Sequence, residues 1–249
     1  MKSIYRLLKI FIPLARLLGI RFGIMQKLKK GIAKTNRYIR IEGNWFKIDE
    51  NDSLGLFGGE FEKDERKCFK EIISKDDIVA DVGANIGYQT VLFALLSKKV
   101  YAFEPNGEAL ELLQKNLEMN NVNADIVPFA VSDINGSLNL NYFQSGSAYS
   151  SILPKDVMGN ESSKSETVKS ITLDDFFHDK LKPTFIKIDI EGLEKKALEG
   201  AKEILKTKPV LFIEINPEFT NVMEMVKWIE GFGYSSKKIS RINYLFQPV

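Results

Sequence analysis

The residues most suited to chemistry lie in a glycine turn between a buried strand and a helix. In "ADVGANIGYQT", Asp81 stands at the end of an apolar run, and Gly83 and Gly87 follow it. Glycine lets the backbone turn sharply and pass close to a ligand, and the following helix presents free N–H groups at its start. This turn therefore predicts a binding site for a ligand with a small anionic group.

Two common phosphate-binding patterns do not fit this turn. A G-x-G-x-x-G fingerprint begun at Gly83 requires glycine where the chain has Asn85 and Tyr88, and a Walker loop requires a Gly-Lys pair that this turn lacks. The next predicted strand, "VYAFEP", ends in Glu104. A carboxylate there accepts hydrogen bonds from both ribose hydroxyls and repels a 2′-phosphate. A nucleoside-like ligand without phosphate therefore fits these residues.

A second group of charged residues follows the predicted strand at 184–190. In "FIKIDIEG", Lys187, Asp189 and Glu191 alternate with isoleucines and so share one face. One interpretation is a structural ion pair of Lys187 with Asp189, with Glu191 facing solvent. The other places Asp189 and Glu191 beside a reacting group, where they orient or deprotonate a hydroxyl. The next strand, "PVLFIEINPEF", brings Glu214 to the same rim as a substrate-side candidate.

A parallel sheet is needed to bring these strand ends together. Short apolar strands alternate with helices along most of the chain, with strands expected at 78–82, 99–104, 124–131, 184–190 and 209–215 and helices at about 86–97, 107–120, 193–205 and 218–231. This alternation predicts an α/β fold with a mostly parallel sheet and helices on both faces. Ligands bind such a sheet at the carboxyl ends of its strands, where the strand order reverses.

Other segments predict smaller features. "RYIRIEGNWFKID" predicts a β-hairpin around Gly43-Asn44, and "YSSKKISRINYLFQPV" predicts a closing strand pair. Residues 141–170 are rich in Ser, Gly and Asn and predict a functional loop or insertion. Cys68 and His178 are the only residues of their types, which excludes Cys/His zinc sites. We assign no metal, and any metal would have to be held by carboxylates.

The charge is distributed unevenly along the 249 residues. Residues 1–41 hold eleven Lys or Arg and no acidic residue, whereas the rest holds 24 basic and 33 acidic residues. Apolar residues at helical spacing predict a basic amphipathic helical leader at 1–36, followed by a globular domain at 37–249. Interrupting charges exclude a membrane-spanning helix and a secretory signal. The leader either contacts an anionic membrane through residues 1–34, on the inner face, or caps the core of a cytoplasmic protein.

Four blocks of the sequence together resemble the FkbM family of S-adenosylmethionine-dependent methyltransferases. The blocks are "DVGANIGYQT", "AFEPNGEALELLQKNLEMNN", "VPFAVSDINGSLNL" and "FIKIDIEGLEKKALEGA", within 77–216. The resemblance implies a class I methyltransferase, Rossmann-like fold. It also implies S-adenosyl-L-methionine as methyl donor and transfer to a hydroxyl of a saccharide, glycan or natural product. Family members often have histidine near Asn216, so this chain departs from the pattern there.

The resemblance also implies roles for individual residues. The donor would lie beside the turn from Asp81 to Gly87, with Asp81 near its ammonium group and Glu104 on its ribose. Adenine contacts would follow the third strand, where Asp133 is alternatively a turn residue. The expected donor-binding residues are Asp81, Gly83, Asn85, Gly87, Glu104, Ala130, Val131 and Asp133, and the expected catalytic residues are Asp189, Glu191 and Glu214.

Two other classes of function stay open at this level. A nucleotide-cofactor oxidoreductase is disfavoured by the missing glycines, and a non-catalytic binding module is disfavoured by the intact acidic residues. The expected partner is a hydroxyl-bearing small molecule or glycan. Nucleic acid is not expected as a substrate, because the acidic body carries no basic groove motif.

Overall fold

The computed structural model describes residues 37–50, 52–56, 61–143, 150–151 and 162–249. The predicted leader at 1–36 lies outside these ranges, and with it the prediction of membrane contact. Among the helices within these ranges, none combines the length and the apolar character needed to cross a membrane.

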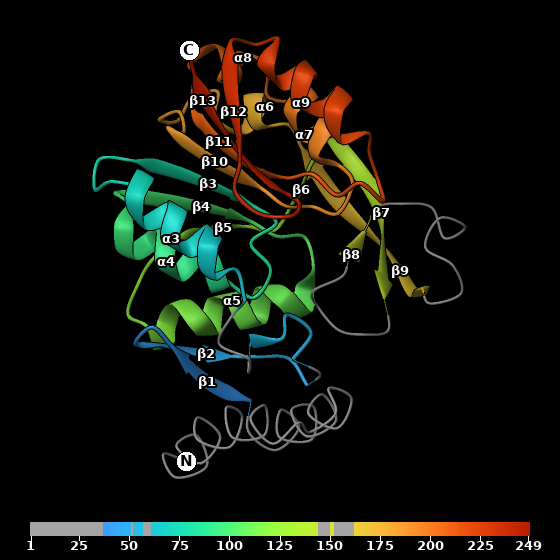
Figure 1. Cartoon of the computed structure of the whole chain (residues 1–249). Coiled ribbons are helices and arrows are strands. Elements are labelled where there is room, and N and C mark those ends of the chain that lie inside the picture. The colour runs from blue at the N-terminus through green and yellow to red at the C-terminus, as the bar shows by residue number, and fades with distance from the viewer. Residues whose placement is uncertain (1–36, 51, 57–60, 144–149, 152–161) are drawn as a thin grey trace, which may run out of the picture.

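A sheet of seven strands forms the centre of the molecule (Figure 1). The strand order is β12-β13-β11-β10-β3-β4-β5. The five neighbouring strands β11, β10, β3, β4 and β5 run parallel to one another. β13 runs antiparallel to both of its neighbours, β11 and β12. Their bounds are β3 Ile78–Val82, β4 Lys99–Phe103, β5 Asp125–Val127, β10 Phe185–Ile188, β11 Val210–Glu214, β12 Tyr234–Lys238 and β13 Asn243–Pro248. The predicted mostly parallel sheet and its closing strand pair are confirmed.

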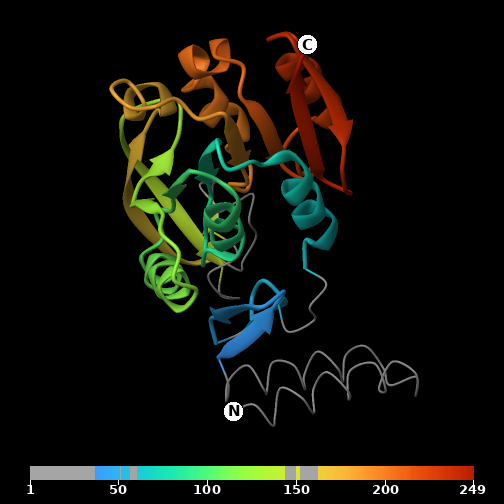
Figure 2. The ribbon, with the colours of Figure 1, turned by 90° about the vertical axis from the view of Figure 1, so that its left-hand side faces the viewer.

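Helices cover both faces of this sheet, as Figures 1 and 2 show. Alternate residues of β3 face opposite sides: Val79 packs with the phenylalanines of α3 and α4, whereas Ala80 and Val82 pack with α7 and α8. The first face carries α3 Lys63–Ile72, α4 Tyr88–Leu96 and α5 Gly107–Met119; the second carries α6 Leu173–Phe176, α7 Glu194–Glu199, α8 Lys202–Lys206 and α9 Val222–Glu230. The predicted α/β architecture is therefore confirmed.

Two predicted elements are each divided in the structure. The helix expected at 193–205 is α7 followed by α8, because the Asp174 carboxylate accepts hydrogen bonds from the N–H groups of Glu203 and Ile204 and caps α8 separately. The strand expected at 124–131 is β5 followed by β6 Ala130–Val131, with Pro128 between them. Proline has no N–H to continue a ladder.

The segment at 141–170 was expected to be a loop or insertion, and this prediction is wrong in part. A second sheet, with the order β6-β9-β7-β8, contains β7 Gly136–Phe143, β8 Ser150–Ser151 and β9 Ser162–Ile171. β7 and β9 form a long antiparallel pair beside the main sheet (Figure 1). Among the residues of β7 and β9 whose side chains the structure describes, few are apolar and buried, Leu140 and Val168 among them, so the alternation that marks a half-buried strand is weak.

The predicted N-terminal hairpin is confirmed, with its turn one residue earlier. β1 Tyr38–Ile41 and β2 Asn44–Lys47 are joined by Glu42 and Gly43, whose φ angles are 49° and 90°. The side-chain amides of Asn116 on α5 and of Asn120, which follows the last residue of α5, hydrogen-bond the backbone of β2 at distances of 2.6 to 3.0 Å. The hairpin thus docks on α5 instead of joining a sheet.

Candidate active site

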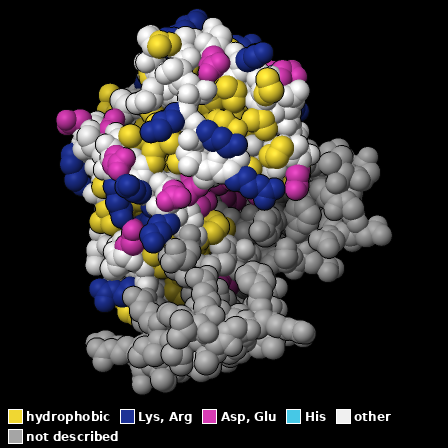
Figure 3. Space-filling model, in the orientation of Figure 1, with side chains coloured by type: hydrophobic (Ala, Val, Ile, Leu, Met, Phe, Trp, Pro, Cys, Tyr) yellow, Lys and Arg dark blue, Asp and Glu magenta, His cyan; other side chains and the backbone are white. Residues whose placement is uncertain are grey.

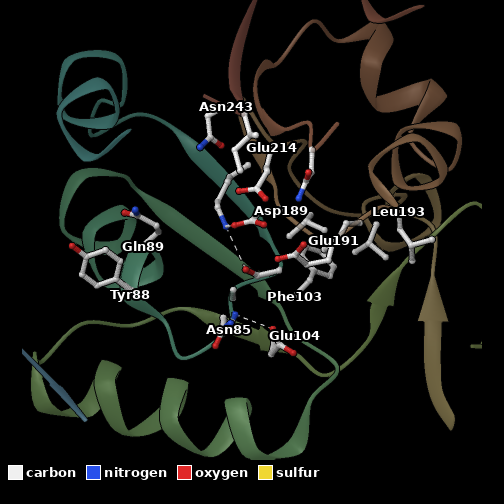
Figure 4. Close-up of a pocket in the computed structure, with 18 of the residues that line it drawn as sticks. Asn85, Tyr88, Gln89, Phe103, Glu104, Asp189, Glu191, Leu193, Glu214 and Asn243 are labelled. Atoms are coloured by element: carbon white, nitrogen blue, oxygen red, sulfur yellow. Dashed lines mark hydrogen bonds and ion pairs between the residues drawn. The ribbon is translucent and has the colours of Figure 1, made fainter. Parts of the chain in front are cut away.

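A cavity of about 550 Å³ opens at the carboxyl ends of the central strands (Figure 4). The chain runs from β3 through β4 to β5 on one side, and β10 then lies on the other side of β3. The strand order therefore reverses between β3 and β10, which is where a ligand is expected in an open α/β sheet. Figure 3 shows acidic side chains gathered in a hollow near the middle of the face.

The glycine turn after β3 lies directly against the end of β10. The N–H groups of Gly83 and Ala84 both donate to the Phe103 carbonyl at 3.0 Å. Gly83 has a φ of 82°, and a Cβ atom there would lie 1.9 Å from the carbonyl oxygen of Asp189. Only glycine accommodates both the positive φ angle and the close approach of the Asp189 carbonyl oxygen. Gly83 and Asn85 line the cavity, as does Glu104.

Glu104 is held at the end of β4 by two backbone N–H groups. Its Oε2 accepts from Asn85 at 2.8 Å and its Oε1 accepts from Asn106 at 2.8 Å. Each carboxylate oxygen can accept a second hydrogen bond, so Glu104 still has capacity for two ligand hydroxyls. Burial raises the pKa of Glu104 to about 7.

The other expected donor-binding residues divide into two groups. Ala130 and Val131 line the cavity, whereas Asp81, Gly87 and Asp133 do not belong to its lining. The Asp81 carboxylate is fully buried and accepts a hydrogen bond of 2.6 Å from the Thr90 hydroxyl. Contacts of these five expected donor-binding residues with a ligand stay predictions.

The three expected catalytic carboxylates converge, and we call Asp189, Glu191 and Glu214 the transfer cluster (Figure 4). One oxygen of each lies within 4.8 Å of the others, close enough to hold a metal ion as well as a proton. Burial and the neighbouring carboxylates raise the pKa of Glu191 to about 8 and that of Glu214 to about 10. Glu191 and Glu214 therefore hold protons that isolated carboxyl groups lose near pH 4.

Lys187 supplies the positive charge beside this cluster. Its Nζ lies 3.1 Å from Asp189 Oδ2, 3.8 Å from Asp81 Oδ1 and 3.4 Å from the Gly83 carbonyl oxygen. Burial lowers the pKa of Lys187, but the two carboxylates outweigh it and raise the pKa above its ordinary value. The predicted ion pair is confirmed, whereas Glu191 lines the cavity instead of facing bulk solvent.

Glu194 shapes the turn that presents Glu191. Its carboxylate accepts from the N–H groups of Gly192 at 3.0 Å and Ile190 at 3.3 Å. Glu191 between them has a φ of 51°, an unusual conformation for a residue with a side chain. Glu194 is thus a positioning residue that the sequence pattern does not mark.

A further part of the cavity wall is built from residues that the sequence analysis does not predict for the site. Glu62 precedes α3, Glu65 lies in its first turn, Gln89 lies on α4 and Asn243 begins β13. The Asn243 amide donates to Glu65 Oε1 at 3.1 Å, and the Gln89 amide donates to Glu62 Oε2. Gln89 is a long polar residue in a helix whose other residues, Thr90 apart, are apolar or aromatic, and this is the sequence signal for such a role.

The raised carboxyl pKa values predict an unusual pH dependence of stability. Carboxyl groups whose pKa values are raised from 4.5 to about 7 include Glu62, which is half-buried, and Glu104 and Glu194, which are buried. Between pH 4.5 and 7 these groups hold protons in the folded state that the unfolded state has lost, so stability falls as the pH rises through this window. We expect a Tm about 3–8 °C higher at pH 6 than at pH 8. Melting curves in buffers of matched ionic strength check this, and equal Tm values would contradict it.

Comparisons with known proteins agree with this geometry. Residues 81–236, more than half of the chain, match the model of the methyltransferase FkbM domain. The hexuronic acid methyltransferase AglP of Haloferax volcanii is 28% identical over 162 residues, which cover 62% of each chain. The tRNA (guanine(37)-N(1))-methyltransferase Trm5b of Methanocaldococcus jannaschii is 34% identical over 70 residues, which cover 28% of this chain and 20% of that protein. The aligned parts thus span less than two thirds of these relatives.

A solved structure supports the same fold. The methyltransferase FkbM from Methylobacillus flagellatus KT superposes with a TM-score of 0.51 and 21% identity, covering 70% of this chain and 44% of that chain. The class I methyltransferase fold implied by the sequence is therefore confirmed. Since the family model matches more than half of the chain, including the three members of the transfer cluster, the chain belongs to the FkbM methyltransferase family.

Proposed function

We propose that this protein is an S-adenosyl-L-methionine-dependent O-methyltransferase acting on a hydroxyl of a saccharide, glycan or natural product. The observation that carries the proposal is Glu104, which faces the cavity beside a glycine turn without phosphate-binding features. Its two oxygens retain capacity for two ribose hydroxyls. The AglP relative, named for a hexuronic acid, supports a saccharide acceptor.

The donor supplies an electrophilic methyl group on a sulfonium. Glu104 binds and orients its ribose, while Ala130 and Val131 offer an apolar surface for the adenine. Asp189, the member of the transfer cluster that forms an ion pair in the structure, provides negative charge on the side of the cavity where the sulfonium would lie. A cavity of about 550 Å³ also lies within the usual range for small-molecule sites.

Proton handling divides among the three members of the transfer cluster. Glu191, with a pKa of about 8, is the best general base, because its pKa lies close to neutral pH. Glu214, with a pKa of about 10, keeps its proton and donates a hydrogen bond within the site. Asp189 is fixed by Lys187 and orients the acceptor hydroxyl. With the methyl donor bound, Glu191 in its ionised form would accept the hydroxyl proton as the C–O bond to the methyl carbon forms and the C–S bond breaks.

Donor binding tests the proposal first. Calorimetry should show binding of S-adenosylmethionine and none of NAD. Glu104→Ala should weaken donor binding about 10- to 100-fold, because charge-assisted hydrogen bonds to the ribose are lost. The matched control is Glu108→Ala, an exposed residue in the first turn of α5. Binding of NAD without binding of the donor would instead support the oxidoreductase alternative.

Transfer of a labelled methyl group separates an enzyme from a binding module. The protein is incubated with labelled donor and either a glycan extract or a panel of saccharides. A labelled product supports the enzyme, and donor binding without any product supports the binding module. The cytoplasmic location and the contact of residues 1–34 with an anionic membrane stay predictions from the sequence, as does the absence of a nucleic-acid substrate.

A further inference from the structure

Glu62 is a cavity carboxylate that the proposed reaction does not use. It lines the cavity just before α3 and has a φ of 47°, a strained conformation for a residue with a side chain. Its Oε2 accepts from the Gln89 amide. Within the described part of the chain, Oε1 accepts no hydrogen bond and Glu62 forms no ion pair. A carboxylate in this state is suited to a ligand that donates hydrogen bonds.

A chain of side chains fixes the orientation of this carboxylate. Arg66, buried beneath Tyr88, donates to Gln89 Oε1 at 3.2 Å and to the Tyr88 carbonyl at 3.1 Å. Its other nitrogens donate to Glu42 at 2.9 and 3.1 Å. Because Arg66 occupies the oxygen of the Gln89 amide, the amide nitrogen must face Glu62. The carboxylate is thereby held toward the cavity.

The place of Glu62 in the cavity indicates which group it meets. Gln89, Glu104 and the transfer cluster lie at three different sides of the cavity (Figure 4). A donor with its ribose on Glu104 and its sulfur at the cluster has only its amino-acid end left to place. Glu62 lines the same cavity as Lys187 and Asp189.

The sequence predicts that Asp81 meets the ammonium group of the donor, but in the structure Asp81 does not line the cavity. The Asp81 carboxylate is fully buried behind Thr90 and Lys187 and does not line the cavity. We propose that Glu62, oriented by Gln89, binds the α-ammonium group of the methyl donor. This inference rests on the proposed function, because it requires that the cavity binds that donor.

A pair of donor-like ligands tests the contact without any acceptor. S-adenosylhomocysteine carries the α-ammonium group, whereas 5′-methylthioadenosine lacks the whole amino-acid end. Glu62→Gln should weaken binding of S-adenosylhomocysteine about 10- to 30-fold, as expected for loss of a charge-assisted hydrogen bond. Binding of 5′-methylthioadenosine should change less than about twofold, because it never reaches Glu62.

Two further variants keep the test decisive. Glu71→Gln makes the same change at an exposed position of α3 and should alter neither affinity. Glu62→Asp keeps the charge, so it should preserve the preference for S-adenosylhomocysteine to within about threefold even if Glu62→Gln unfolds the protein.

Three outcomes overturn the inference. Equal weakening of both ligands by Glu62→Gln would make Glu62 a purely structural residue. Unchanged affinity for both would place Glu62 on the acceptor side or outside the site, and in either case the proposed function would stand. A wild-type protein that binds neither ligand would overturn the proposed function together with the inference.

Discussion

Glu191→Gln and Asp189→Asn should each lower the rate of methyl transfer about 100-fold or more while the protein remains folded. Both variants remove a carboxylate from the transfer cluster but keep the shape of the side chain. Proton transfer and hydroxyl positioning matter most in the transition state, so the rate falls much further than donor affinity. Glu191→Gln also removes a group that is costly to ionise in the folded state, so its stability should hold or rise.

Asp189→Asn is expected to lower the stability of the fold more than Glu191→Gln does. It removes the 3.1 Å partner of Lys187, but Asp81 remains 3.8 Å from the same ammonium. The destabilisation should therefore fall below the ~3–5 kcal/mol expected when a buried charge loses its only partner. Thermal melting and single-turnover transfer are measured on the same preparations, with exposed Glu111→Gln as the matched control. Wild-type transfer rates in both variants would remove the transfer cluster from the mechanism.

Gly83→Ala should destabilise the protein by about 3–5 kcal/mol, because two penalties add at one position. The φ of 82° is strained for alanine, and the new methyl group would lie 1.9 Å from the Asp189 carbonyl oxygen. Relief requires β3 and β10 to separate at the strand ends that form the cavity. Donor affinity should therefore fall together with stability.

Urea unfolding measures the effect of Gly83→Ala against a control in the same protein. Gly107→Ala places a methyl group where no heavy atom lies within 4 Å and where φ is not positive. It begins α5, so alanine there should be neutral or should stabilise the protein by up to about 1 kcal/mol. If the two alanine variants unfold at the same urea concentration, the close approach of β3 and β10 is not as tight as described.

The sequence predicts the central sheet well because its strands are buried on both faces. Continuous apolar runs such as the one ending at Phe103 have few alternatives to a buried strand, and the polar residues that follow such runs therefore stand at strand ends. The convergence of Asp189, Glu191 and Glu214 follows from that topology alone. Their pKa values do not, since these depend on burial and on distances between strands.

The features that the sequence does not reveal depend on packing between distant segments. Glu62 and Gln89 meet only because α3 packs beside α4, and Asn243 reaches Glu65 across 178 residues of chain. The pair β7 and β9 is largely polar, so its stability comes from backbone pairing that leaves little trace in hydrophobic periodicity.

The strand order at one edge of the sheet also constrains how the protein folds. β13 lies between β11 and β12, although β12 comes first in the chain. β12 pairs with β13 and not with β11, so it cannot join the sheet until β13 has been made and folded back onto it. β12 can therefore belong to the sheet only once β13 pairs with the open edge of β11, a pairing between segments about 30 residues apart in the chain. Asn243 arrives with β13, and the wall opposite Glu104 is completed only at that step of folding.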